Sequence, residues 1–319
     1  MTAIYVLMLS VGASVVVGMP KYPTLPRNTE NPVGGARLQQ QTVSRLKRGL
    51  RDVRRWVLKR FEEIPKREIT INASVPGYLV NETRYDYLIS VEELRLIIEE
   101  IRRRLGIEVP PDYMAAQTVL AYEAGTGTAV AQLAALTDDY TREITQVLAS
   151  EPWQRRVALV RSRVFEQMES FNGDTATDLG RVLSQGVEDG LNPRTVAKDI
   201  RARFGIAERR AETIARTEIG SALRRATRDE NQDARERLGI NTQLLWLSAL
   251  SPTTRASHAR KHSQVLTAQD VAEFYSQGGE SVNCKCSQVS VLIGDDGKPI
   301  LGPLEARLEK QRAAFEPDR

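Results

Sequence analysis

Histidine and cysteine are scarce in this 319-residue sequence, which contains two of each. Two cysteines cannot supply the disulfide framework of a small secreted domain, so the sequence predicts folding in a reducing compartment or a fold that needs no disulfide bridges. We interpret the origin of the protein as cytoplasmic. Several enzyme motifs are also missing: there is no phosphate-binding Gly-rich loop with its Lys, no His-Glu-x-x-His and no Gly-x-Ser-x-Gly. No common catalytic class is therefore supported by a motif.

A hydrophobic run near the start of the sequence is too short to span a membrane. The run Ile4–Met19 has 16 residues, whereas a bilayer requires roughly 20. No Lys or Arg precedes it and no small-x-small cleavage site follows it, so a signal peptide is not favoured. We expect no stable membrane anchoring and interpret the run as a buried strand or an apolar plug inserted into a partner. A true start of translation at Met19 is a third alternative.

Charge is unevenly distributed along a sequence of ordinary globular composition, with 41% hydrophobic and 27% charged residues. The segment Arg37–Arg67 contains eight Arg and three Lys against three acidic residues, a net charge of +8. The whole chain carries +4, so the remainder carries −4. A basic block beside a mildly acidic body predicts an acidic partner, either nucleic acid or an acidic protein surface.

The first third divides into residues 1–36, an apolar terminus with a Pro-, Asn- and Gly-rich extended arm, and residues 37–110, a basic helical docking region. Within the second part, apolar residues recur every three or four positions from Val43 to Ile64, which predicts a helix. Basic residues occupy its other faces: Arg45, Arg48, Arg51, Arg55 and Lys59. These residues are interpreted either as the solvated face of a packed helix or as a surface that docks on a partner or on DNA phosphates.

A short hairpin or an irregular connection is expected over Thr70–Leu88, with Pro76-Gly77 as a turn. A helix is expected from the Ser90/Glu93 capping box to Gly106. Residues 111–206 form a helical region, and a long helix follows it. Breaks are predicted at Gly125-Thr-Gly127, Asn172-Gly173, Gly190–Pro193 and Gly205. The expected helices are Asp112–Ala124, Thr128–Ser150, Pro152–Ser170, Ala176–Glu188, Pro193–Phe204 and Glu208–Arg237.

The pattern changes after Gly239, within a module assigned to residues 207–319. The expected elements are strand Thr242–Leu247, a short polar helix or loop at Thr254–His262, helix Ala268–Tyr275, strand Ser287–Ile293, a turn at Asp295–Lys298 and helix Leu304–Phe315. The predicted fold class is α+β, with a predominantly helical N-terminal and middle region followed by a small α+β C-terminal module.

All the histidines and cysteines fall in this module, as His258, His262, Cys284 and Cys286. Two histidines four apart share a face if their segment is helical, and two cysteines two apart share a face of a strand, so the four could bind Zn²⁺ tetrahedrally. The alternative is a structural histidine, a surface histidine and two apolar thiols. A Cys–His nucleophile pair has no identifiable orienting carboxylate, and a Cys284–Cys286 disulfide would be strained.

Arg255 lies three residues before His258 and shares its face in a helix. The two side chains could bind phosphate, or they could hold a carboxylate such as Glu218 inside the module. An internal ion pair is the favoured interpretation, because a small α+β module needs polar contacts where its loops meet.

Four segments resemble the phage Mu F-like head morphogenesis family, the minor capsid proteins of tailed bacteriophages. They are Ala211–Glu218, Trp246, Thr253–His258 and Asn283–Cys286, preceded by a helix-turn-helix-like stretch at Leu183–Ile200. The resemblance covers about Leu179 to Ile293. The family's characteristic residues fall on Arg216, Thr217, Glu218, Trp246, Arg255, His258, Cys284 and Cys286, of which Arg216, Glu218, Arg255 and His258 are expected to form a structural polar cluster. The sequence departs from the family pattern at Ser251-Pro252, where an acidic residue is usual, and at Val282, where Pro is usual.

The resemblance implies a non-enzymatic protein of the virion, inside the head near the portal vertex, that resides in the host cytoplasm during assembly. Its implied roles are procapsid assembly and DNA packaging or ejection. Its implied partners are the portal protein, the major capsid or scaffolding protein and packaged double-stranded DNA. Two alternatives stay open: a toxin-like or nuclease effector enzyme carried in the virion, and a DNA-binding protein whose affinity depends strongly on salt.

Overall fold

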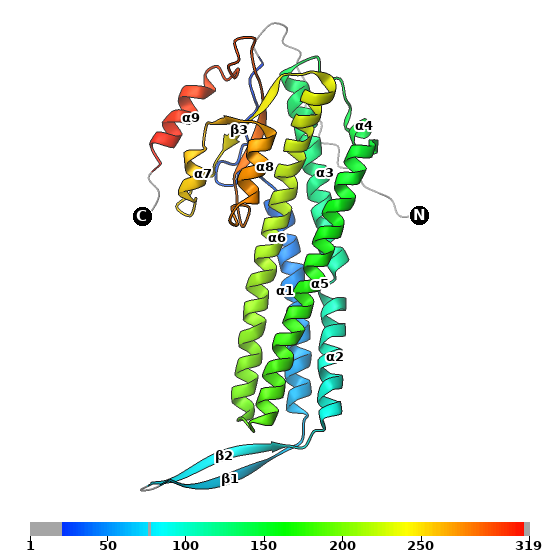
Figure 1. Cartoon of the computed structure of the whole chain (residues 1–319), viewed down its shortest axis with the longest axis vertical. Helices are drawn as coiled ribbons and strands as arrows, with labels where there is room; N and C mark the ends of the chain where they lie inside the picture. Colours follow the sequence, from blue (N-terminus) through cyan, green and yellow to red (C-terminus); the bar gives the residue numbers. More distant parts are fainter. Residues whose placement is uncertain (1–20, 76–77, 316–319) are drawn as a thin grey trace.

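Long helices packed side by side form an elongated stalk (Figure 1). The computed structural model describes residues 21–75 and 78–315, so Ile4–Met19 and the Pro76-Gly77 turn lie outside the described residues. Helices α1 (Ala36–Glu62), α5 (Glu151–Glu188) and α6 (Pro193–Leu238) run along the stalk. Helices α2 (Val91–Glu108) and α3 (Pro111–Leu136) follow one another along its fourth side, and α4 is Ile144–Ala149. The stalk core includes Leu46, Leu50, Ile101, Leu133 and Met168.

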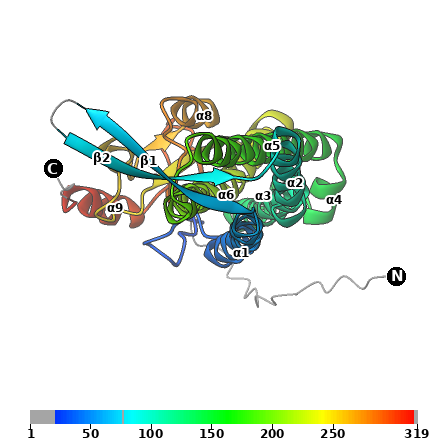
Figure 2. The same cartoon turned by 90° about the horizontal axis from the view of Figure 1, so that it is seen from below.

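A two-stranded ribbon closes the far end of the stalk (Figure 2). Strands β1 (Lys66–Val75) and β2 (Tyr78–Tyr87) pair antiparallel along their whole length. The backbone N–H of Tyr85 donates to the Gly190 carbonyl at 2.9 Å, and the Tyr87 hydroxyl donates to the Leu191 carbonyl at 2.8 Å. The base of the ribbon is therefore fixed to the loop between α5 and α6.

The C-terminal module contains a three-stranded antiparallel sheet in the order β4-β3-β5. Its elements are β3 (Thr242–Leu247), α7 (Ala256–Arg260), β4 (Val265–Leu266), α8 (Ala268–Ser276), β5 (Ser287–Leu292) and α9 (Leu304–Ala313). One face of the sheet contributes Leu245 and Val289 to a core that includes Leu308 of α9. The other face contributes Leu244 and Trp246 to a second core. The predicted α+β fold class is thus confirmed.

Helix α6 connects the stalk to the module, so the boundary assigned at 206/207 falls inside a continuous helix. The Asn231 side-chain amide donates to the Gln243 carbonyl at 3.1 Å and to the Ser290 hydroxyl at 3.0 Å. Residues 21–35 contain neither helix nor strand and pack along the module, where the Val33 N–H donates to the Lys285 carbonyl.

The helix breaks predicted at Gly125, Asn172-Gly173 and Gly205 are wrong, because α3, α5 and α6 pass through them. Gly125 allows close packing: a Cβ atom there would lie 2.8 Å from the Leu223 carbonyl oxygen of α6. Asn172 is buried, and its amide donates to the Val109 carbonyl at the end of α2. Isolated glycines cost a helix about 1 kcal/mol, which tertiary packing offsets. The helix expected over Thr128–Ser150 is also wrong, since α3 ends at Leu136.

None of the helices within the described residues combines the length and apolar character that a membrane span requires.

Candidate functional site

His258, Cys284 and Cys286 converge in the C-terminal module, and all three are buried. His258 lies on α7, while the two cysteines lie just before β5, with Lys285 between them. The His258 Nδ1 atom is 3.4 Å from each sulfur. The three ligand atoms lie within 4.8 Å of one another. The structure therefore brings together three of the four residues that the sequence singles out as metal ligands.

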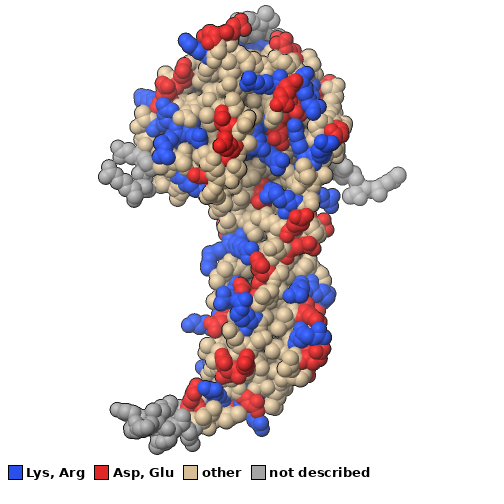
Figure 3. Space-filling view, viewed as in Figure 1, with Lys and Arg blue, Asp and Glu red and all other residues tan. Residues whose placement is uncertain are grey.

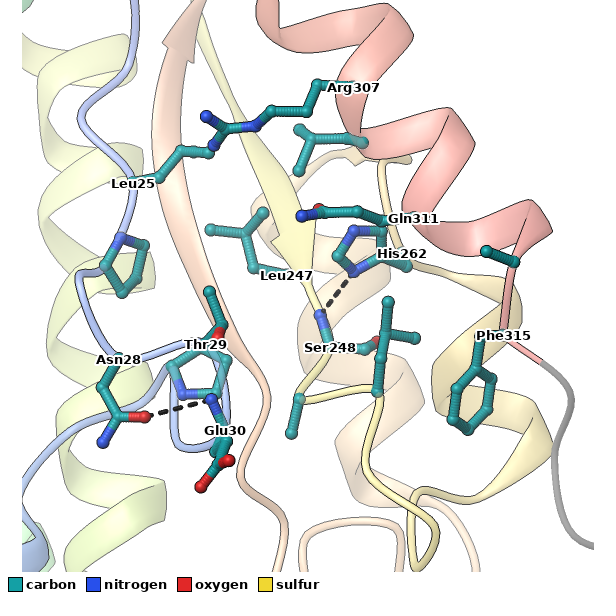
Figure 4. A pocket seen from close by; sticks show the side chains of 16 residues that line it. Leu25, Asn28, Thr29, Glu30, Leu247, Ser248, His262, Arg307, Gln311 and Phe315 are labelled. Atoms are coloured by element: carbon teal, nitrogen blue, oxygen red, sulfur yellow. Dashed lines mark hydrogen bonds between the residues drawn. The ribbon is translucent and has the colours of Figure 1, made fainter.

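His262 does not join this cluster, which corrects the four-ligand prediction. Helix α7 ends at Arg260, and Ser263 has a φ of 69°, so the helical spacing does not extend to the second histidine. The His262 Nδ1 atom instead accepts the Ser248 N–H at 3.1 Å. Its ring points toward a separate cavity of about 450 Å³ between residues 25–32 and α9, with Gln311 beside it (Figure 4).

Glu280 is the residue at this site that the sequence does not reveal. Its Oε2 atom is 2.7 Å from the His258 Nε2 atom. The Arg255 guanidinium lies 3.1 Å from the same nitrogen and donates to the Val282 carbonyl at 2.6 Å. Glu280 follows two glycines with positive φ in the loop after α8, so no periodic pattern places it near His258.

The polar cluster predicted from Arg216, Glu218, Arg255 and His258 divides into separate pairs. Arg255 and His258 are neighbours, as expected. Glu218 is buried on α6 but pairs with Arg163 of α5. Arg216 pairs with Glu212 one turn earlier, at 2.6 Å. The prediction was wrong for Glu218 and Arg216, because both side chains pair with residues of the stalk helices α5 and α6 and not with Arg255 or His258.

Aromatic side chains enclose the imidazole of His258. Trp246 and Phe274 meet its ring edge to face, with centroids 5.9 and 5.0 Å away. Tyr275 stacks on Trp246, and its hydroxyl is 3.4 Å from the Cys284 sulfur. These aromatic rings exclude water from one side of the three ligand atoms and strengthen the interaction of each with a bound charge.

The two thiols form an unequal pair. A hydrogen bond with Cys286, assisted by His258 and Arg224, lowers the pKa of Cys284 well below its ordinary value. The same hydrogen bond and burial raise the pKa of Cys286 well above its ordinary value. Two thiolate charges this close repel each other in a buried site, so one proton is retained by the pair.

A small pocket of about 160 Å³ opens beside the cluster. Its walls include all three converging residues and the hydroxyl-bearing side chains of Ser251, Thr253 and Thr254. The Ser251 and Thr254 hydroxyl oxygens lie 3.2 Å apart, within hydrogen-bonding distance of each other. The sulfur and nitrogen atoms therefore border a small polar space rather than a closed apolar core.

Helix α1, which carries the basic residues, lies on the side of the molecule opposite α8 (Figure 2). Arg48, Arg51, Arg55 and Lys59 are exposed, as a docking surface requires. Arg45 is partly buried instead, and its guanidinium donates to the Glu108 carbonyl at 2.9 Å. Elsewhere on the stalk, on the face seen in Figure 3, Lys and Arg are interspersed with Asp and Glu.

A second buried polar cluster on α6 was not predicted from the sequence. Asp229 accepts the Tyr122 hydroxyl at 2.7 Å, and Asp233 accepts two hydrogen bonds from Arg156 at 2.9 Å. The signal would have been several acidic residues on the face that α6 turns toward α3 and α5. Since guanidinium groups neutralise these carboxylates, the cluster links helices rather than binding a cation.

The segment that contains this site is similar to known proteins. Residues 177–289 match the family described as phage Mu protein F like protein. An uncharacterized protein of Haemophilus influenzae is 28% identical over 138 residues, which cover 42% of this chain and 29% of that protein. The chain therefore matches less than a third of that relative's length, and no solved structure matches it significantly. The resemblance seen in the sequence is thus confirmed for residues 177–289, which are similar to the phage Mu F-like proteins.

Proposed function

We propose that the protein is a minor capsid or head morphogenesis protein of a tailed bacteriophage, placed inside the head near the portal vertex. Its roles would be procapsid assembly and DNA packaging or ejection. The observation that carries this proposal is the family match over residues 177–289, which includes α6, β3 and all three residues of the buried cluster. Partners are the portal protein, the major capsid or scaffolding protein and packaged double-stranded DNA.

The exposed side chains of α1 are the proposed contact with an acidic partner. Arg48, Arg51, Arg55 and Lys59 form an exposed basic row along the stalk. Neighbouring basic residues are already engaged within the molecule, since Lys47 pairs with Glu212 and Arg54 pairs with Glu208. Within the row only Arg55 has a carboxylate partner among the described residues, Asp52 one turn earlier at 2.5 Å. The row therefore presents exposed positive charge to a portal surface or to DNA phosphates.

Portal capture by variants of this row tests the proposal. Deleting the N-terminal third is unsuitable, because α1 contributes Leu46, Leu50 and Phe61 to the stalk core. Substitution of the row by serine (R48S, R51S, R55S, K59S) should leave the fold intact and reduce recovery of the purified portal protein by at least about tenfold, the loss of about 1.4 kcal/mol. The matched control is R95S and R103S on α2, exposed arginines that pair with glutamates of their own helix. Equal recovery by all three proteins would contradict the docking role.

An effector enzyme carried in the virion is the second candidate, and Glu280 is the observation that favours it. With Glu280 hydrogen-bonded to His258, and His258 beside Cys284, the structure supplies the orienting carboxylate of a nucleophile pair. Nucleic-acid cleavage by the purified protein that is lost in both H258A and C284A would support the enzyme over the assembly protein.

A further inference from the structure

We propose that His258, Cys284 and Cys286 bind one zinc ion and leave its fourth coordination position open to the pocket beside them. The proposal depends on the local geometry and stands whether or not the protein acts in head assembly. A soft donor set of two sulfurs and one imidazole nitrogen is typical of zinc.

The separations between the ligand atoms fit a tetrahedral ion. Zinc lies about 2.3 Å from sulfur and about 2.0 to 2.1 Å from nitrogen, so a tetrahedral site holds sulfur and nitrogen about 3.6 Å apart. In this structure His258 Nδ1 is 3.4 Å from the sulfur of Cys284 and 3.4 Å from that of Cys286. Both sulfur–nitrogen separations therefore fit one such tetrahedron, and the three ligand atoms lie within 4.8 Å of one another.

The surroundings of His258 match those of a histidine that ligates a metal. Such a histidine usually donates its other ring N–H to a carboxylate, which fixes the ring and its tautomer. Here Nδ1 faces the sulfurs, while Nε2 is 2.7 Å from Glu280 Oε2. Arg255 further restrains this loop by donating to the Glu280 and Val282 carbonyls.

Charge balance also favours a divalent cation. A bound divalent ion would displace the proton that the two cysteines share, and the two resulting thiolates carry two negative charges that require compensation. The Arg224 guanidinium donates to the Cys284 carbonyl at 2.8 Å. One divalent ion would neutralise both thiolates and remove their repulsion.

The fourth position has no protein ligand among the described residues. No further His, Cys, Asp or Glu of residues 21–75 and 78–315 joins the group, and His262 is bonded to Ser248. The adjacent pocket of about 160 Å³ can hold water, whose share of liquid volume is about 30 Å³. An ion here would therefore carry a water molecule that a small ligand can replace, unlike the closed four-ligand site of a zinc finger.

Metal titration of the full chain tests the ligand set. Purified, reduced protein should bind one equivalent of Co²⁺, with sulfur-to-cobalt charge-transfer absorption, and one equivalent of Zn²⁺ should displace it. C284S and C286S should each weaken binding by more than about 100-fold, and E280Q by about 10- to 100-fold. The matched control H262N should bind as the natural protein does.

A second measurement tests the open position. Imidazole or azide added to the cobalt-loaded protein should change its visible absorption bands, because either ligand can replace the bound water. Circular dichroism confirms that each variant is folded. If the cysteine variants unfold, the weaker metal binding expected of E280Q still tests the ligand set.

Three results would overturn the proposal. The first is no stoichiometric metal binding by folded protein whose two thiols titrate as free. The second is a Cys284–Cys286 disulfide in freshly purified protein. The third is loss of binding in H262N, or a cobalt spectrum insensitive to added ligands, either of which would indicate a closed site.

Discussion

Burial of His262 makes the free energy of unfolding depend on pH. Its ring is 4% exposed, and burial, together with the nearby positive charge of Arg312, lowers its pKa below the ordinary value of 6.5. Below pH 6.5 the unfolded chain therefore gains a proton at His262 that the native protein does not. The free energy of unfolding consequently falls as the pH falls below 6.5, by at most about 1.4 kcal/mol per pH unit, until the native pKa is reached.

The variant H262N isolates this effect. Asparagine keeps an oxygen that can accept the Ser248 N–H but does not titrate, so the variant should lose the part of the pH dependence that His262 contributes. Urea unfolding between pH 5 and pH 7.5 measures it, because every other titratable group is the same in the two proteins. Identical pH profiles for the two proteins would show that His262 is not held neutral by the fold.

The residues of the candidate metal site show which parts of the site can be predicted from the sequence and which cannot. Because His258, Cys284 and Cys286 belong to residue types used almost nowhere else, composition and the family resemblance were sufficient to select them. His262 was misplaced because the four-ligand prediction required a helix that includes both histidines, whereas α7 ends at Arg260. Glu280 was missed because its position depends on a glycine-rich loop whose path is set by tertiary contacts such as that with Arg255.

At the scale of secondary-structure elements, substitution of two helix glycines by alanine should change the stability of the protein in opposite directions. Gly125→Ala should destabilise the protein by about 1 to 3 kcal/mol, because the new Cβ would lie 2.8 Å from the Leu223 carbonyl and 3.0 Å from its Cα, both backbone atoms. Gly173→Ala should stabilise it by about 0.5 to 1 kcal/mol, because no heavy atom lies within 4 Å and alanine is the better helix former. Urea unfolding midpoints compare the two variants with the natural protein. A Gly125→Ala variant as stable as Gly173→Ala would show that the α3–α6 contact can widen at little cost.

These glycines also explain which elements were predictable. Strand β3 has the bounds expected from the sequence, and the Ser90/Glu93 capping box begins α2 as predicted, because both depend on local pattern. A glycine within a helical pattern has two interpretations, because it marks either the end of the helix or a place where another backbone packs closely against it. In α3 the second reason applies, and it depends on Leu223, about a hundred residues further along the chain.

At the scale of the whole molecule, α6 determines how stalk and module are coupled. Its 46 residues contribute Ile200 and Phe204 to the stalk core, while Arg224 and Asn231 bond to the module. Chains of this size often unfold in several steps, domain by domain. A single rigid helix shared by both parts favours one cooperative transition instead, because neither part can lose its structure without exposing a face of α6.

The three tryptophans allow this coupling to be measured. Trp246 lies in the module, whereas Trp56 and Trp153 lie in α1 and α5. In the variant W56F/W153F, fluorescence reports the module alone, while far-ultraviolet circular dichroism reports mainly the helices of the stalk. We expect the two urea midpoints to coincide. If Trp246 becomes exposed at a lower urea concentration than the one that melts the helices, then the module is an independent unit and α6 does not transmit stability between the two parts.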